Sequence, residues 1–91
     1  MRVGQIRKRD RNETAIVAAL RQAGVRVQPM SAPGFADLVC WTPRLGVLLL
    51  EVKAPRGRKT RLQNIFQDAG WPVQIVRTVP EALAACGLRV P

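Results

Sequence analysis

Two apolar runs joined by a Pro/Gly-containing loop constrain the fold of this chain most strongly. The first run spans residues 35–41 and the second spans residues 47–52, with Thr-Pro-Arg-Leu-Gly between them. Runs of this length on either side of a turn-forming loop are typical of a β-hairpin. Because Val47–Leu50 are four consecutive apolar residues, we expect the second arm to be a central strand that is buried on both faces.

Two carboxylates and a lysine interrupt this apolar hairpin. If the loop is symmetric about Arg44, Asp37 lies directly opposite Glu51, with Cβ atoms roughly 5 Å apart. Lys53 follows Glu51 by two residues and therefore lies on the same face of the sheet. Opposed carboxylates repel each other, and Mg²⁺, which often takes only one or two carboxylates, would turn the pair into a binding site. The alternative is a half-exposed strand end with ordinary charges.

The charge balance predicts a polyanionic partner. The 91 residues include 15 Lys+Arg and 6 Asp+Glu, which gives a formal net charge of +9. A chain of this length forms one domain with one modest core, so we expect a single domain over residues 1–91 that begins with a basic arm at 1–11. Nucleic acid is favoured over a ribosome-like or membrane-surface role. The residues expected to hold phosphates are Arg7, Lys8, Arg9, Arg11, Arg56, Arg58, Lys59 and Arg61.

The alternative explanation for both basic stretches is that they are solvated segments without a phosphate partner.

The two cysteines, Cys40 and Cys86, are far apart and no histidine is present, which argues against a structural zinc site. Two thiols without a secretory signal suit a reducing compartment, and no apolar run approaches the ~20 residues that span a bilayer. We therefore expect a cytoplasmic protein with no membrane segment.

The N-terminal half of the chain predicts a helix and an edge strand before the hairpin. Apolar residues recur at helical spacing over residues 12–23, with Asn12 as the expected N-cap. Glu13 would lie in the first turn, where a negative charge suits the helix dipole. Residues 25–30 alternate between apolar and polar, and Pro29 limits this segment to an edge strand or to the end of a strand.

The C-terminal half predicts a helix, a strand and a final helix. Thr60 and Gln63 fit a capping box that opens the first helix, and Gly70 ends it. Its apolar stripe consists of Leu62, Ile65, Phe66 and Ala69. A right-handed crossover through this helix lays the strand at 72–76 parallel to the strand that precedes the helix. A second capping box opens a short helix at 79–86. The expected order is α-β-β-β-α-β-α, an α/β fold with a mixed sheet flanked by helices.

The order and spacing of these motifs resemble the PD-(D/E)XK nuclease superfamily, and within it the VRR-NUC family. The motifs are Glu13 on the first helix, Gly34-Phe-Ala-Asp37, an apolar strand that ends in Glu51-Val-Lys53, a basic turn, and Gln63 on the next helix. The resemblance covers nearly the whole chain and implies a restriction-endonuclease-like α-β-β-β-α-β core with a short C-terminal helix. Phe35-Ala36 departs from the family pattern, which more often has a small residue and a proline before the aspartate.

The resemblance implies a site and a chemistry. Asp37, Glu51 and the backbone carbonyl of Val52 would bind Mg²⁺ or Mn²⁺, with Glu13 as a further ligand. Lys53 would activate the attacking water or neutralise the phosphate, and Gln63 would orient Lys53 or the phosphate. Stand-alone members of viral type resemble structure-selective endonucleases that act as homodimers on branched DNA such as Holliday junctions. The chain would then be a phage-type protein that acts inside the host cell.

Two other functions stay open from the sequence. One is a non-catalytic basic module that binds nucleic acid and is indifferent to metal. The other is a nuclease that is active only within a larger complex. Loss of DNA binding in Arg56 or Arg58 variants would fit all of these functions, whereas metal-dependent cleavage that is lost in Asp37→Ala fits only a nuclease.

Overall fold

The computed structural model describes residues 12–32, 34–54, 56, 58 and 61–89 of the chain. Within these ranges the helices and strands follow the predicted order, and they confirm an α/β fold with a four-stranded mixed sheet. The elements are α1 (Asn12–Gln22), β1 (Arg26–Pro29), β2 (Leu38–Thr42), β3 (Gly46–Val52), α2 (Arg61–Asp68), β4 (Val73–Val76) and α3 (Val79–Ala85).

The strands lie side by side in the order β1-β2-β3-β4, so that the predicted hairpin, β2 and β3, is central. β1 pairs antiparallel with β2, β2 pairs antiparallel with β3, and β3 pairs parallel with β4. Leu38 faces Leu50 and Thr42 faces Gly46, so the hairpin is symmetric about Arg44 as the sequence predicts. The edge position of β1 and the parallel orientation of β4 are also confirmed.

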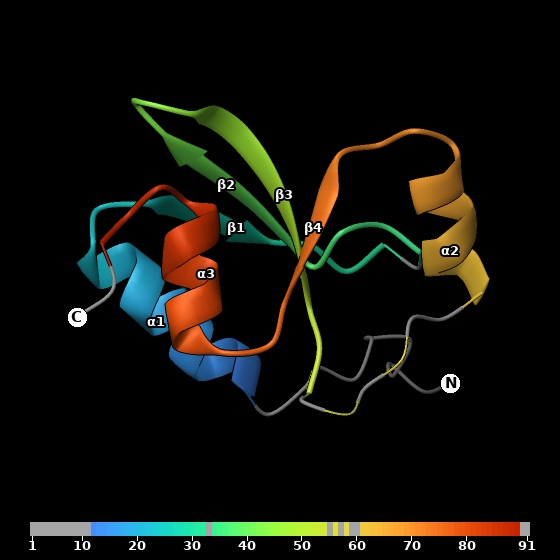
Figure 1. Ribbon diagram of the computed structural model, residues 1–91, viewed down its shortest axis with the longest axis horizontal. Coiled ribbons are helices and arrows are strands. Elements are labelled where there is room, and N and C mark those ends of the chain that lie inside the picture. The colour runs from blue at the N-terminus through green and yellow to red at the C-terminus, as the bar shows by residue number, and fades with distance from the viewer. Residues whose placement is uncertain (1–11, 33, 55, 57, 59–60, 90–91) are drawn as a thin grey trace, which may run out of the picture.

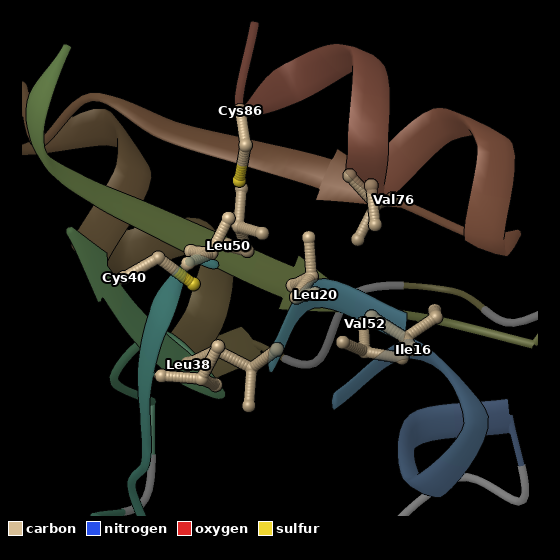
Figure 2. Close-up of a cluster of buried hydrophobic side chains, with 11 residues drawn as sticks. Ile16, Leu20, Leu38, Cys40, Leu50, Val52, Val76 and Cys86 are labelled. Carbon is tan, nitrogen blue, oxygen red and sulfur yellow. The ribbon is translucent and has the colours of Figure 1, made fainter. Parts of the chain in front are cut away.

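The hydrophobic core lies between the sheet and two helices. α1 and α3 contact each other and lie on the same side of the strands, while α2 lies on the other side (Figure 1). Ile16 and Leu20, one helical turn apart on α1, are completely buried. Figure 2 shows them with the side chains that face them: Leu38, Cys40, Leu50, Val52, Val76 and Cys86.

Cys40 lies in the apolar strand β2 and is a buried core residue. A hydrogen bond with the Cys86 thiol and burial together raise the pKa of the Cys40 thiol far above its ordinary value. A thiol that stays protonated behaves as a small apolar side chain. Both cysteines therefore have a sufficient structural explanation as parts of the core.

At the start of α3 the predicted N-cap is confirmed, whereas the reciprocal hydrogen bond of the capping box goes to Arg77, one residue before the cap. The Thr78 hydroxyl accepts a hydrogen bond from the Glu81 N–H at 3.2 Å, and Glu81 Oε1 accepts one from the Arg77 N–H at 2.7 Å. Gly87, with φ +76°, follows the helix in the left-handed conformation that glycine tolerates. This local sequence fixes the start and the end of α3 without help from distant residues.

The expected burial of β3 on both faces is wrong for its first half. Leu50, Glu51 and Val52 are buried, whereas Val47 is 66% exposed. α1 and α3 cover only one face of the sheet, and Val47 lies near the tip of the hairpin on the other face. On α2, Leu62 and Ile65 of the predicted apolar stripe are more than half exposed. Among the described residues, no helix is long and apolar enough to cross a membrane.

Candidate active site

Polar residues gather where β3 ends. Glu51 is buried near the end of the strand, and Lys53, the first residue beyond it, is buried as well. The Lys53 N–H donates to the Val76 carbonyl at 3.0 Å, which fixes the backbone of Lys53 against β4. Lys53 Nζ lies 3.7 Å from Glu51 Oε2. A buried carboxylate needs a partner of this kind because burial without one is costly.

Asp37 reaches the same strand end from β2. Its Oδ2 accepts a hydrogen bond from the Val52 N–H at 2.7 Å. β2 begins only at Leu38, so the carboxylate replaces the main-chain acceptor that a longer strand would supply. The N–H and C=O of one strand residue point to the same side, so the Val52 carbonyl also faces the side on which Asp37 lies. Asp37 and Val52 are thus hydrogen-bonded neighbours at the end of β3, whereas the sequence predicted Glu51 as the residue opposite Asp37.

α2 contributes Gln63 to this cluster from its first turn. The Gln63 side-chain amide donates a hydrogen bond to Glu51 Oε2, the same oxygen that lies near Lys53. Gln63 is buried although most of α2 is exposed. This contact joins α2 to β3. It brings together Glu51, Lys53 and Gln63, three of the residues to which the resemblance assigns a catalytic role.

Gly34 allows α2 to approach the loop that precedes Asp37. Its φ is +77°, and a Cβ atom built on it would lie 2.7 Å from Leu62 Cβ and 3.3 Å from the Leu62 backbone. A glycine at such a position can serve either a permissive turn or the close approach of a ligand. The structure supports the turn, and the close neighbour is α2 itself.

The start of α1 is tied to the same region by a residue that sequence analysis assigned to another role. Asn12 is the first residue of α1, and its side-chain amide donates to the carbonyls of Lys53 at 2.9 Å and Arg77 at 2.7 Å. Arg77 Nη1 in turn donates to the Ala54 carbonyl at 2.6 Å. The expected N-cap is therefore a bridge between α1 and the ends of β3 and β4.

No local motif marks this bridge in the sequence. The carbonyls that Asn12 contacts are 41 and 65 residues away. The predicted parallel pairing of β3 and β4 could have pointed to this contact, because neighbouring parallel strands finish at the same end of a sheet. Lys53 and Arg77, each one residue past its strand, had to meet there.

Glu13 is buried on α1. It lines a hollow with Val17, Arg21 and Pro29, at the junction of α1 and β1. Pro29 pairs with Leu38, and the Met30 N–H donates to the Asp37 carbonyl at 2.8 Å, so this junction adjoins the Asp37 loop. The neighbouring residue, Asn12, donates to the Lys53 carbonyl, so the start of α1 also contacts the backbone just beyond β3.

The basic residues divide into two groups. Arg56, Arg58 and Arg61 are exposed and follow Lys53 closely in the chain. The remaining predicted phosphate contacts, Arg7, Lys8, Arg9, Arg11 and Lys59, lie outside the described residues. Thr60, the expected N-cap of α2, lies outside them as well.

The donor atoms fit a hard divalent cation. Asp37 and Glu51 supply carboxylates and Val52 a carbonyl, and Mg²⁺ binds such oxygens while keeping several waters. Across the part of the chain that the structure describes, no three carboxylate, thiol or imidazole side chains gather closely enough to hold a metal. A site with two carboxylates agrees with that finding, and a role for Glu13 as a third protein ligand stays a prediction.

Comparison of the chain with protein-family models, with curated proteins and with solved structures finds no match. The resemblance to the VRR-NUC family therefore stays a prediction from the sequence motifs, and the function has to be argued from the site.

Proposed function

We propose that this chain is a Mg²⁺- or Mn²⁺-dependent nuclease that hydrolyses DNA phosphodiester bonds. The observation that supports this most is the buried contact of Glu51 with both Lys53 and Gln63, next to Asp37 on the Val52 N–H. The chain has only six acidic residues, and two of them are buried together at one strand end. A purely structural strand end does not need this concentration of charge.

Each residue has a chemical task in this proposal. A bound divalent cation would supply an activated water and would stabilise charge on the phosphate. Asp37, Glu51 and the Val52 carbonyl would hold that ion. Lys53 would place a fixed positive charge beside the phosphate, where a partly dry site strengthens electrostatic interactions. Gln63 would keep the Glu51 carboxylate in one orientation and contact Lys53 or the phosphate.

Branched DNA bound by a homodimer is the substrate and assembly that we propose. The exposed apolar side chains of Leu62 and Ile65 on α2, with Trp71 just beyond it, form a surface that a second copy would cover. A two-fold pair would present two sites and two sets of basic loops to the four arms of a junction. Selection would then depend on DNA shape and flexibility rather than on base edges.

A binding module without catalysis is the second candidate. It is favoured by the finding that the described residues include no cluster of three metal-binding side chains. It would use the exposed Arg56, Arg58 and Arg61 to hold phosphates, and it would bind DNA equally well with or without a divalent ion.

Glu51→Gln separates the two candidates. The amide preserves the size of the side chain and removes its charge. We expect wild type to nick supercoiled plasmid with Mg²⁺ or Mn²⁺, and EDTA or Glu51→Gln to abolish nicking while DNA binding in EDTA persists. Binding by wild type without nicking in either metal would favour the binding module. A nuclease that needs a larger complex would bind Mn²⁺ in calorimetry and still leave the plasmid intact.

A further inference from the structure

The face of the sheet opposite α1 and α3 carries an exposed aromatic and cationic pair. Trp41 on β2 is paired with Arg26 on β1 and with Val47 on β3, so the three form one row across the sheet. The Arg26 guanidinium carbon lies 4.9 Å from the centroid of the Trp41 ring. Trp41 is 39% exposed, and Arg26 is exposed as well. The pair is thus accessible from solvent.

This row lies on the same face as Glu51. Strand residues alternate between faces, so Val47, Leu49 and Glu51 of β3 point to one side. Glu51 lies four positions after Val47 along β3, and at ~3.3 Å per residue the two rows lie roughly 13 Å apart. A nucleic-acid strand with a phosphate at Lys53 could therefore reach Trp41 along the sheet.

The surface around the pair is hollowed. An open depression of about 270 Å³ is lined by Arg26, Gln28, Val39, Trp41 and Val47, among others. None of the described residues that line it is acidic. Apolar side chains beside an indole and a guanidinium are suited to the flat face of a nucleobase, and the net charge of +9 attracts its phosphates.

We propose that Trp41 and Arg26 form a stacking platform for an unpaired nucleobase of single-stranded DNA. The base stacks on the indole or on the outer face of the guanidinium. A base inside a duplex is already stacked, so only an unpaired base reaches the platform without an unstacking cost. Stacked bases rise ~3.4 Å each, so this base lies within about four nucleotides of the phosphate at Glu51 and Lys53. That last distance rests on the proposed nuclease function, whereas the stacking itself does not.

A second copy of this chain is the main competing occupant of the platform. Each copy has a net charge of +9, so two platforms that each carry Arg26 repel each other, whereas DNA is negatively charged and is attracted to the platform. Charge therefore favours the nucleic acid.

Fluorescence tests the proposal because the chain has only two tryptophans. In Trp71→Phe, Trp41 is the sole tryptophan and reports on its own surroundings. We expect oligothymidylate of about eight nucleotides, a length within the usual range of single-strand sites, to quench its emission in EDTA. A blunt duplex of the same length leaves the emission unchanged. In Trp41→Phe, the remaining Trp71 reports no quenching.

Affinity measured by anisotropy of a labelled oligothymidylate in EDTA gives the second readout. Trp41→Ala is expected to weaken binding at least about fivefold, which is the lower end of the effect of removing one stacked base. Trp41→Phe keeps an aromatic ring and stays within about twofold of wild type, while Arg26→Ala is weakened as well. Circular dichroism confirms that each variant is folded.

Several outcomes would overturn the stacking proposal. One is equal affinity of Trp41→Ala and wild type, and another is equal quenching by the duplex. A molecular mass in gel filtration that halves in Trp41→Ala, without any effect on oligonucleotide affinity, would assign the platform to a second copy. All these measurements are made without metal, so a failure here leaves metal-dependent cleavage untouched, and a failure of cleavage leaves the stacking result intact.

Discussion

The Asp37 carboxylate accepts a hydrogen bond from the Val52 N–H at 2.7 Å. Asp37 lies one residue before β2 begins, and Val52 is the last residue of β3. The side chain therefore has a structural role in addition to its proposed role as a metal ligand. It completes the hydrogen bonding of a buried strand end at the point where the neighbouring strand is missing.

Two substitutions of Asp37 separate these roles. Asp37→Asn keeps an oxygen that can accept the Val52 N–H but removes the charge, so we expect near wild-type stability in urea and loss of metal-dependent cleavage. Asp37→Ala leaves a buried N–H without an acceptor, and the free energy of unfolding should fall by about 1–3 kcal/mol. An Asp37→Asn variant that cleaves like wild type would exclude Asp37 from metal binding.

Asn12 allows a direct test of how α1 is held. An N-cap tolerates Asn and Asp almost equally, whereas a donor to two carbonyls does not tolerate a carboxylate. We expect Asn12→Ala to lower the free energy of unfolding by about 1–3 kcal/mol, and Asn12→Asp to lower it at least as much. Urea unfolding monitored by circular dichroism measures both. Equal stability of Asn12→Asp and wild type would restore the N-cap interpretation.

Gly34 controls the position of α2 relative to the site. Gly34→Ala introduces a Cβ in a left-handed conformation, which costs roughly 1–2 kcal/mol, and places it against Leu62. Gly24→Ala is the matched control, since its φ is +91° but nothing lies within 4 Å of the added atom. We expect the Gly34 variant to be less stable than the Gly24 variant and to have lower nuclease activity. Equal effects would show that contact with α2 is unimportant.

The exposed apolar surface of α2 leads to a prediction about assembly. If a second copy covers Leu62 and Ile65, replacing both with serine should convert a dimer into a monomer. Light scattering coupled to gel filtration gives the mass, and Asn64→Ser, an exposed polar position on the same helix, serves as the control. A wild-type protein that stays monomeric at high concentration would contradict the dimer.

Much of the fold could be predicted because its determinants are local or symmetric. The hairpin follows from two apolar runs around Arg44, and its pairing brings Asp37 to the end of β3 without further information. The start of α3 follows from Thr78 and Glu81, whose hydrogen bonds span only a few residues. The positions of Glu51 and Lys53 follow from the period of two along β3.

What the sequence could not predict depends on contacts between distant segments. The pattern of α2 predicts an apolar stripe but not what covers it, and Leu62 and Ile65 are exposed. Four apolar residues in a row predicted full burial of Val47, but α1 and α3 cover one face of the sheet and Val47 lies on the other, where it is exposed. Asn12 could cap a helix or bridge two carbonyls, and only the ends of β3 and β4 decide between these roles.

Cleavage of labelled DNA tests the central claim most directly. Four-way junction, flap, single-stranded and linear duplex substrates are incubated with Mg²⁺ or Mn²⁺ and wild type, Lys53→Ala or Arg44→Ala. Arg44 lies in the exposed hairpin turn and controls for loss of one positive charge. We predict metal-dependent cleavage of the junction by wild type and Arg44→Ala, and none by Lys53→Ala. Cleavage by Lys53→Ala at the wild-type rate, or DNA binding by wild type without cleavage in either metal, would contradict the account.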